Sequence, residues 1–356
     1  MPIEKIDIEN FLLLSDKFPV LDARSPAEYS HAHIPGAFSV PIFTDEQRKI
    51  IGTAYKKQSR QVAVDHGLNY FSERMKIIPG EVENILRSYK LKSGGETKTL
   101  LVHCWRGGMR SDAVGWLLNL YGYKIYLLKG GYKTFRRWVL AQFEKEYSLK
   151  VLGGFTGSGK TNVLKELSRI GQKVIDLEGL ANHKGSAFGA LGEKNQPSSE
   201  MFENLLALQL WQIEDACNSD AQTKNEIWLE DESAHIGTVG IPKAFWQQMR
   251  NSSLYFLEIP FEERLKNIVK TYGVYDKQEL IGSVLKIQKR LGGLNTKNVI
   301  QFISEGDLNE AFSILLKYYD KMYSQSLEKR EDVNSLLQKI PCTDTQTRNA
   351  AFLLER

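Results

Sequence analysis

One short segment of the chain combines a cysteine with two arginines and two glycines, between an apolar run and a helical pattern. In CWRGGMRS, Cys104 is followed by Arg106, Gly107, Gly108 and Arg110. A cysteine at the entry to a helix faces backbone N–H groups and the positive end of the helix dipole, and both favour the thiolate, as do nearby arginines. We therefore predict a catalytic loop in which Cys104 is a nucleophile or carries an anionic group, such as a persulfide, a selenide or a phosphate-like oxyanion. The alternative, a cysteine that only fills the core, fits poorly with so polar a neighbourhood.

A second segment, GFTGSGKT, matches the phosphate-binding pattern G-x-x-x-x-G-K-T. Gly154, Gly157 and Gly159 would let backbone N–H groups turn toward a phosphate, and the helix that follows adds a favourable dipole. Lys160 would bring a positive charge to the outer phosphates, and Thr161 would hold a magnesium ion. The pattern predicts a site for a phosphate or diphosphate and does not specify ATP. A glycine-rich turn that binds no ligand is the alternative.

Polar residues follow two further predicted strands in the same region. The strand in IWLEDES ends at Glu230 and Asp231, where proteins with phosphate loops place a carboxylate that holds magnesium. We therefore predict Thr161 and Asp231 as magnesium ligands, against the alternative of solvated acids at a strand end. In DLEGLANHKGSAFG, three residues are candidates for contacts with diphosphate or RNA backbone, or else form a helix cap with surface charges: His183, Lys184 and Ser186.

The elements around these segments alternate between strand and helix. In the first part, apolar runs predict strands within residues 18–24, 38–42, 98–103 and 124–128, a helical pattern covers 111–122, and 91–97 has loop composition. In the second part, strands are predicted within 149–154, 173–179, 226–231 and 254–259, and only helical patterns follow from about residue 274. Alternation of this kind indicates α/β folding with parallel sheets. We predict three regions: 1–147 with the cysteine loop, 148–273 with the phosphate loop, and a helical part, 274–356.

Composition narrows the class of protein. The chain has 356 residues, of which 42% are hydrophobic and 25% charged, with a net charge of +4, which permits a nucleic-acid partner without requiring one. Cys104, Cys217 and Cys342 lie far apart, so neither a disulfide framework nor a zinc site is expected, and Cys217 is interpreted as a small buried group. No secretory signal and no membrane-spanning run is apparent, so we expect a cytoplasmic protein that does not enter membranes.

The first region resembles the rhodanese domains. The segment LDARSPAEYSHAHIPGAFSVP carries residues of their pattern: Asp22, Arg24, Glu28, Tyr29, His33, Ile34, Gly36 and Ala37. The resemblance implies that the active cysteine lies in the loop after a central strand, as Cys104 does, and that His33 has a structural role. The loop C-x-x-x-x-x-R is one residue longer than in ordinary rhodaneses and is similar to that of phosphatase relatives, which suggests room for a tetrahedral phosphorus substrate.

In combination and order, the motifs resemble the bacterial tRNA 2-selenouridine synthase family. The resemblance rests on CWRGGMRS, GGFTGSGKT, DLEGLANHKGSAFG, QPSSEMFENLLA and EDES, and it runs from about Pro19 to Phe261. It implies that wobble 2-thiouridine in tRNA is first alkylated with geranyl diphosphate and then converted to 2-selenouridine with selenium from selenophosphate. Cys104 would carry the selenium and the phosphate loop would hold geranyl diphosphate. No tightly bound cofactor is implied, and a selenophosphate-supplying enzyme is a further expected partner.

The resemblance also requires a surface for tRNA and an apolar slot for the geranyl chain. Basic residues interleaved with aromatics form one candidate surface, and a second lies in the helical part: Lys124, Lys129, Lys133, Arg136 and Arg137, and then Lys286, Lys289 and Arg290. Aromatic residues at helical spacing are candidates for the slot, although such residues more often fill a core: Phe188, Phe202 and Trp211.

Two other classes of function stay open at this point. The cysteine loop and the phosphate loop, considered separately, are compatible with a phosphatase or an ATP-dependent kinase. A non-catalytic protein that binds tRNA or carries sulfur is the third class. The oligomeric state and the particular tRNAs are not specified by the sequence.

Overall fold

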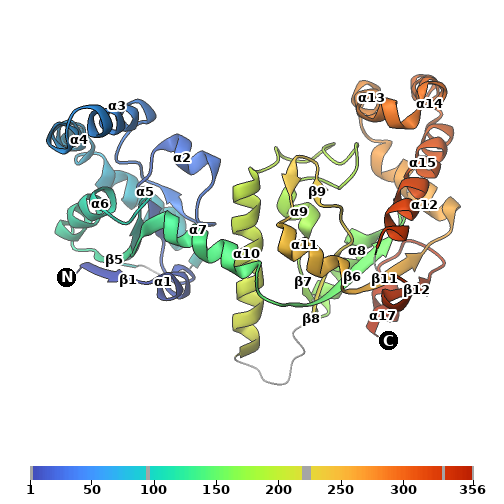
Figure 1. Cartoon of the computed structure of the whole chain (residues 1–356), viewed down its shortest axis with the longest axis horizontal. Helices are drawn as coiled ribbons and strands as arrows, with labels where there is room; N and C mark the ends of the chain where they lie inside the picture. The colour runs from blue at the N-terminus through green and yellow to red at the C-terminus, as the bar shows by residue number, and fades with distance from the viewer. Residues whose placement is uncertain (1–2, 94–96, 219–225, 331–332, 355–356) are drawn as a thin grey trace. The chain divides into compact units, whose positions relative to one another are not determined.

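The computed structural model describes residues 3–93, 97–218, 226–330 and 333–354. The chain divides into two compact units, Met1–Gln142 and Phe143–Arg356 (Figure 1). Each unit contains a five-stranded parallel sheet, so the predicted α/β class with two parallel-sheet regions and a helical C-terminal part is confirmed.

The first unit is built on a sheet with strand order β1-β5-β4-β2-β3. Its strands are β1 (Ile3–Ile6), β2 (Val20–Asp22), β3 (Phe38–Ser39), β4 (Thr99–His103) and β5 (Lys124–Leu128). Its helices are α1 (Ile8–Ser15), α2 (Pro26–His31), α3 (Asp45–Lys57), α4 (Arg60–Arg74), α5 (Ile78–Ser93), α6 (Met109–Leu120) and α7 (Gly131–Gln142).

Side chains of the central strand β4 alternate between two helical layers. Leu100 and Val102 pack into a core with residues of α5 and α6. His103 faces the other side, where it meets Phe11 of α1 and Tyr132 of α7. Because successive residues of a strand point to opposite faces, helices cover both faces of the sheet around β4.

The second unit is built on a sheet with strand order β12-β11-β6-β8-β7 and a small antiparallel pair, β9 and β10. Its strands are β6 (Ser148–Gly154), β7 (Lys173–Val174), β8 (Glu226–Glu230), β9 (His235–Ile236), β10 (Val239–Gly240), β11 (Ser253–Glu258) and β12 (Leu337–Pro341). Its helices are α8 (Lys160–Arg169), α9 (Leu177–Ala181), α10 (Ser199–Asn218), α11 (Lys243–Arg250), α12 (Phe261–Tyr272), α13 (Lys277–Leu291), α14 (Gly293–Glu305), α15 (Leu308–Glu328), α16 (Val333–Leu336) and α17 (Asn349–Leu354).

Helices α12 to α15 form a layer with its own apolar core, which includes Ile268, Val284, Val299 and Phe312. The layer lies together on one side of the second unit in Figure 1. The chain then returns to the sheet, since β12 pairs in parallel with β11. This return is a correction to the sequence analysis, which found only helical patterns after residue 274.

The structure differs from the sequence analysis in three further places. Strand β1 pairs with β5 at the edge of the first sheet and was not predicted. Helix α5 continues to Ser93, where a loop was expected from residue 91, and residues 94–96 lie outside the description. The side chain of Cys217 is also outside it, whereas Cys104 and Cys342 are both free and buried. None of the helices in the described ranges is long and apolar enough to cross a bilayer.

Candidate functional site

Cys104 lies at the carboxyl end of β4, directly before the loop that leads into α6. Its side chain is only 3% exposed. The Sγ atom lies 3.3 Å from Oγ of Ser111, and the Ser111 hydroxyl donates to the carbonyl of Gly108 at 3.0 Å. Gly108 caps α6 without a side chain, so the first N–H groups of the helix are free of a side-chain cap. The sulfur therefore sits at an uncapped helix N-terminus with one hydroxyl beside it, a setting that stabilises an anion on sulfur.

The backbone of the cysteine loop packs directly against the turn between β5 and α7. Gly107 and Gly131 both have positive φ, +62° and +60°. A Cβ on Gly131 would meet the carbonyl of Cys104 and the N–H of Gly107. The N–H of Tyr132 donates to the Cys104 carbonyl at 2.8 Å. These contacts hold the loop in one conformation, because only glycine has room at the two approach points.

The two arginines of the loop have different surroundings. Arg110 donates to Oε2 of Glu28 at 2.9 Å, and Arg48 of α3 lies 3.2 Å from the other oxygen of the same carboxylate. Arg106 is exposed. The positive charge of Arg110 is thus balanced by a carboxylate of α2.

A buried polar group behind the loop positions it. Arg24 forms hydrogen bonds to both oxygens of Asp22 and to the carbonyl of Ala32, and its guanidinium stacks 3.7 Å from the centre of the Tyr132 ring. Burial lowers the pKa of His103, so His103 is neutral and Arg24 is the charged partner of Asp22. The backbone N–H of Tyr132 also donates to the Cys104 carbonyl. The Arg24–Asp22 ion pair therefore supports the cysteine loop through Tyr132.

His33 has the structural role that the rhodanese resemblance implied. Its ring stacks on Tyr29 at 4.0 Å, and its Nδ1 lies 3.0 Å from the Tyr29 carbonyl.

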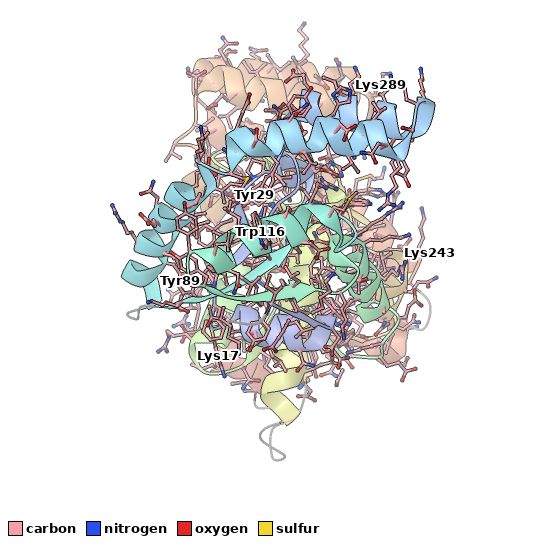
Figure 2. All side chains as sticks on the ribbon, turned by 90° about the vertical axis from the view of Figure 1, so that its left-hand side faces the viewer. Lys17, Tyr29, Tyr89, Trp116, Lys243 and Lys289 are labelled. Carbon is pink, nitrogen blue, oxygen red and sulfur yellow. The ribbon has the colours of Figure 1, made fainter. Side chains whose placement is uncertain are left out.

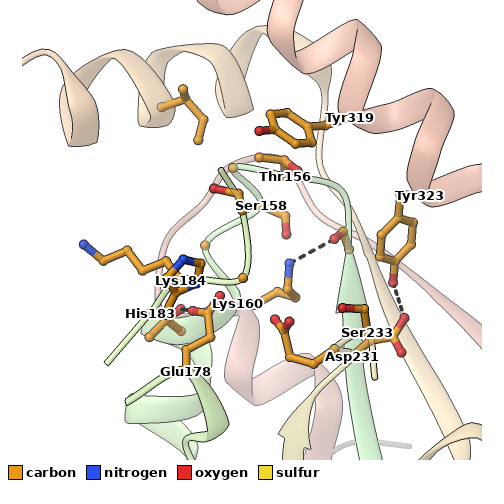
Figure 3. A pocket seen from close by; sticks show the side chains of 18 of the residues that line it. Thr156, Ser158, Lys160, Glu178, His183, Lys184, Asp231, Ser233, Tyr319 and Tyr323 are labelled. Carbon is orange, nitrogen blue, oxygen red and sulfur yellow. Dashed lines mark hydrogen bonds between the residues drawn. The ribbon is translucent and has the colours of Figure 1, made fainter. Parts of the chain in front are cut away.

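The phosphate loop joins β6 to α8 and has the backbone form that its glycines predict. Gly154, Gly157 and Gly159 have φ values of 152°, 84° and 78°, which side chains with a Cβ rarely adopt. Lys160 folds back over the loop, and its Nζ donates to the carbonyl of Gly154 at 3.0 Å (Figure 3). The hydroxyl of Ser158 is buried without a hydrogen-bond partner in the described part of the chain. The loop is therefore shaped as a cradle for an anion.

Helix α12 holds this loop from outside. The amide of Asn267 donates to the carbonyl of Gly157 at 2.9 Å, and Arg264 donates to the carbonyl of Thr156 at 3.1 Å. Arg264 is itself bound by both oxygens of Asp320 on α15. The helical layer thus contributes directly to the conformation of the phosphate loop.

A cavity of about 700 Å3 opens at the loop. It brings together most of the residues that the sequence singled out in this unit: Gly154, Gly157, Gly159, Lys160, Thr161, His183, Lys184, Ser186 and Asp231. His183 lies near the wall in Figure 3, and its Nδ1 is buried without a hydrogen bond among the described residues. Lys184 forms an ion pair with Glu193 at 2.9 Å. The volume accommodates a diphosphate together with a substituent of moderate size.

Two carboxylates that were not predicted as site residues line the cavity near the phosphate loop, Glu178 and Glu232. Oε2 of Glu178 lies 3.3 Å from the Thr161 hydroxyl. Glu232 also lines the cavity, and burial followed by repulsion from Glu178 raises its pKa well above the ordinary value. Glu178 lies in DLEGLANHKGSAFG, the segment that also contains His183, Lys184 and Ser186. Its position shortly after strand β7 is the feature of the sequence that could have identified it.

Glu230 and Asp231, which were predicted, lie elsewhere in the site. Glu230 is fully buried and accepts the N–H of Leu177 at 3.2 Å. Burial and two nearby acids raise the pKa of Glu230 to about 8. Asp231 accepts the hydroxyl of Tyr323 at 2.6 Å and lies 3.4 Å from Arg330 (Figure 3). Its carboxylate thus ties β8 to α15, and among the described residues no group of three or more acidic, histidine or cysteine side chains is placed to bind a metal.

The aromatic candidates for an apolar slot do not come together. Phe188 packs on Tyr272 and Phe312 beside the cavity, in the core of the helical layer. Phe202 is fully buried in α10, and neither it nor Trp211 lines the cavity. The cavity wall instead includes the large apolar or aromatic side chains of Trp246, Ile268, Tyr272, Tyr319, Met322 and Tyr323.

The two basic segments proposed for tRNA belong to different units. The first segment contributes exposed Lys129, which precedes α7, and exposed Lys133 and Arg137, which lie on α7. Lys289 extends into solvent from α13 (Figure 2), and Arg290 lines the mouth of the cavity.

Comparison with known proteins places both loops in a known family. The model of the tRNA 2-selenouridine synthase AAA domain matches residues 147–340, and the model of the rhodanese-like domain matches residues 9–137. The chain belongs to the tRNA 2-selenouridine synthase family. A tRNA 2-selenouridine synthase of Shewanella piezotolerans is 32% identical over 93% of this chain and 95% of its own length. Those of Shewanella pealeana and a Sulfurovum species are 30% and 32% identical, over 93% and 87% of this chain and 95% and 89% of theirs.

Both candidate centres lie within the segments that the two domain models match. Cys104 lies within the match to the rhodanese-like domain, and the phosphate loop, Glu178 and Glu232 lie within the match to the AAA domain. Helices α12 to α15, which hold the loop, are part of the same match.

Proposed function

We propose that this protein converts wobble 2-thiouridine of tRNA into 2-selenouridine through an S-geranyl intermediate, in the cytoplasm. The proposal is supported by the combination of two features in this one chain. The first unit contains a buried cysteine at a helix N-terminus, and the second contains a phosphate loop open to a cavity of about 700 Å3. The first suits a carrier of selenium and the second suits a diphosphate with a hydrocarbon substituent.

In the first step, the thiocarbonyl sulfur of the base attacks C1 of geranyl diphosphate. The C1–O bond breaks, diphosphate leaves with the electron pair, and the base loses its N3 proton. The N–H groups of the phosphate loop and Lys160 would stabilise the charge that develops on the diphosphate. Ile268 and Tyr272 line the cavity beside the loop and would contact the geranyl chain. Alkylation makes the sulfur a better leaving group.

Magnesium fits the donors that meet at this loop. The hydroxyl of Thr161 and a carboxylate oxygen of Glu178 lie 3.3 Å apart, with Glu232 nearby, and oxygen donors of this kind suit Mg2+ when a substrate phosphate completes the set. When bound, the ion would neutralise charge on the departing diphosphate. We assign Thr161 and Glu178 as its protein ligands, and Asp231, bound to Tyr323, as a residue that positions the end of β8.

In the second step, selenium adds to C2 of the base and geranylthiol leaves with the electrons of the C2–S bond. Cys104 is the proposed carrier, with selenium held as a selenyl sulfide, S–Se⁻. Water breaks the P–Se bond of selenophosphate, so that phosphate leaves and selenide is released. Joining selenide to the Cys104 thiolate removes two electrons, which a disulfide accepts, and a thiol returns two electrons when the S–Se bond is cleaved after selenium has bonded to C2. A low-molecular-weight thiol–disulfide pair is the co-reactant that the carrier form requires. Ser111 and the N-terminus of α6 would stabilise the charged selenium.

Nucleoside mass spectrometry tests the proposal. Full-length protein is incubated with 2-thiouridine tRNA, first with geranyl diphosphate and then with selenophosphate and a low-molecular-weight thiol–disulfide pair. We expect S-geranyl-2-thiouridine after the first addition and 2-selenouridine after the second. Unmodified 2-thiouridine after both additions would contradict the proposal, and turnover of ATP or p-nitrophenyl phosphate without tRNA would favour a kinase or a phosphatase.

A further inference from the structure

The helical hairpin α3–α4 stands out in the first unit because it contributes little to the core. It is inserted between β3 and α5, and its two helices lie side by side in Figure 1. Of its residues 45–74, only Ala54, Ala63 and Phe71 are buried. A segment of this length with so few buried residues adds little to the stability of the unit, and most of its side chains face solvent.

The surface of α3 carries a stripe of positive charge. Arg48, Lys49, Lys56 and Lys57 are all exposed. At 100° per residue, Lys49 and Lys56 lie opposite buried Ala54, Arg48 lies about 120° from it and Lys57 about 60° from it. Arg60 extends the stripe at the start of α4, and no Asp or Glu occurs between Glu46 and Asp65. We define Arg48, Lys49, Lys56, Lys57 and Arg60 as the basic stripe.

The charges of the basic stripe are available to a partner. Lys49, Lys56, Lys57 and Arg60 have no ion-pair partner within the described ranges of the chain. Asp45, at the start of the same helix, accepts the N–H of Ala27 at 3.0 Å. Repulsion among unpaired cations disfavours this arrangement unless an anionic partner binds there.

The stripe begins at the cysteine loop. Glu28 accepts from Arg110 of that loop at 2.9 Å and lies 3.2 Å from Arg48, the first residue of the stripe. A single carboxylate therefore joins the hairpin to Arg110 of the cysteine loop, and an anion chain laid along α3 would end at this Glu28–Arg110 pair.

We propose that the basic stripe of α3–α4 binds the sugar–phosphate backbone of the substrate RNA and directs the target base to Cys104. From residue 48 to 57 the stripe is about 14 Å long, enough for several phosphates. Tyr55, which is 59% exposed, lies beside it and offers a ring for stacking on a base. Lysine is depleted in protein–protein interfaces, so a lysine stripe fits RNA better than an acidic protein. The inference rests on the proposed function only in taking tRNA as the substrate.

The test is a binding measurement on the full-length chain, with a fluorescent 2-thiouridine anticodon stem-loop as the probe. The triple variant Lys49→Gln, Lys56→Gln, Lys57→Gln is compared with wild type over a range of salt concentrations. We expect its Kd to rise about tenfold or more at low salt, and the slope of log Kd against log salt to fall by about 2. The charge-reversed triple variant, with Glu at the same positions, should bind still more weakly.

A matched control removes the same charge elsewhere in the unit. Lys17, Lys76 and Arg87 are exposed outside the stripe, and their replacement by Gln should change Kd by less than twofold. The inference would be overturned if the stripe variant and the control had the same Kd and the same salt slope. A stripe that binds an acidic protein instead of RNA would also give this result. Because the readout is binding alone, failure of the proposed chemistry would be seen separately, as wild-type protein that binds the probe and forms no 2-selenouridine.

Discussion

The cysteine loop of the first unit and the phosphate loop of the second follow the same plan. Each leaves the carboxyl end of a central parallel strand, β4 or β6, and leads into a helix, α6 or α8. Both helices begin at a glycine that provides no side-chain cap, Gly108 or Gly159. Each therefore presents free N–H groups and a positive dipole end to an anion.

The two loops differ in the elements that pack against them. Against the cysteine loop, the turn at Gly130 and Gly131 approaches backbone to backbone and leaves the sulfur buried. Against the phosphate loop, the acids after β7 and β8 and the helices α12 and α15 leave a cavity of about 700 Å3. One supersecondary element thus encloses a buried cysteine in the first unit and opens onto a cavity in the second.

The largest effect is expected from Cys104→Ala. If only the closed loop carries selenium, formation of 2-selenouridine should fall by about a thousandfold or more, while S-geranyl-2-thiouridine still forms. Nucleoside mass spectrometry after each step measures both products. Cys342→Ala, which removes the other described thiol, is the control and should retain both activities. Loss of geranylation in a folded Cys104→Ala protein would show that the two loops do not have separate roles.

Lys160→Ala should have the converse effect. Removal of the charge at the open loop is expected to lower the rate of geranylation about a hundredfold, because a preorganised contact to the leaving diphosphate is lost. Conversion of tRNA that already carries S-geranyl-2-thiouridine should continue at the wild-type rate. Lys165→Ala, on the same helix and also at the cavity, is a suitable control. An unchanged rate at saturating and limiting geranyl diphosphate would rule out the phosphate loop as its site.

The close packing of the cysteine loop can be broken with one methyl group. In Gly131→Ala the new Cβ would contact backbone atoms of the Cys104 loop at positive φ, so we expect the free energy of unfolding to fall by about 3 kcal/mol. Gly108→Ala is the matched control, since nothing lies within 4 Å of its added Cβ. Chemical denaturation followed by circular dichroism measures both. Equal stability of the two variants would mean that the approach of the two backbones is not close.

The last effect is a pH dependence set by the acids after β7 and β8. Glu230 has a pKa of about 8 in the folded protein, raised from 4.5, so the folded state keeps a proton that the unfolded chain has released between these values. The free energy of unfolding should therefore fall as pH rises from about 5 to 8, by at most about 1.4 kcal/mol per pH unit. Glu230→Gln should flatten this dependence, whereas Glu226→Gln at the half-buried start of the strand should not. Parallel curves for wild type and Glu230→Gln would contradict the raised pKa.

Much of the molecule could be predicted from the sequence because the determining patterns are local. The strands at residues 99–103, 124–128 and 226–230 fall within their predicted ranges, since each is a short apolar run that pairs deep in a sheet. The glycines of the phosphate loop adopt the positive φ values that their spacing implied. Strand β12 could not be predicted in the same way, because its role depends on pairing with β11, some eighty residues earlier.

By itself, the sequence determined the α/β class, the two reactive loops and the family, because a strand, its glycine-rich loop and the next helix are encoded by neighbouring residues. Only the tertiary structure decided which distant groups face those loops. It brings Glu178 to Thr161, and it pairs Asp231 with Tyr323 of α15. It also shows that α3 leaves a basic stripe exposed beside the cysteine loop. The order of strands in a sheet and the packing of helices on it set these contacts, and neither is contained in any single segment of the chain.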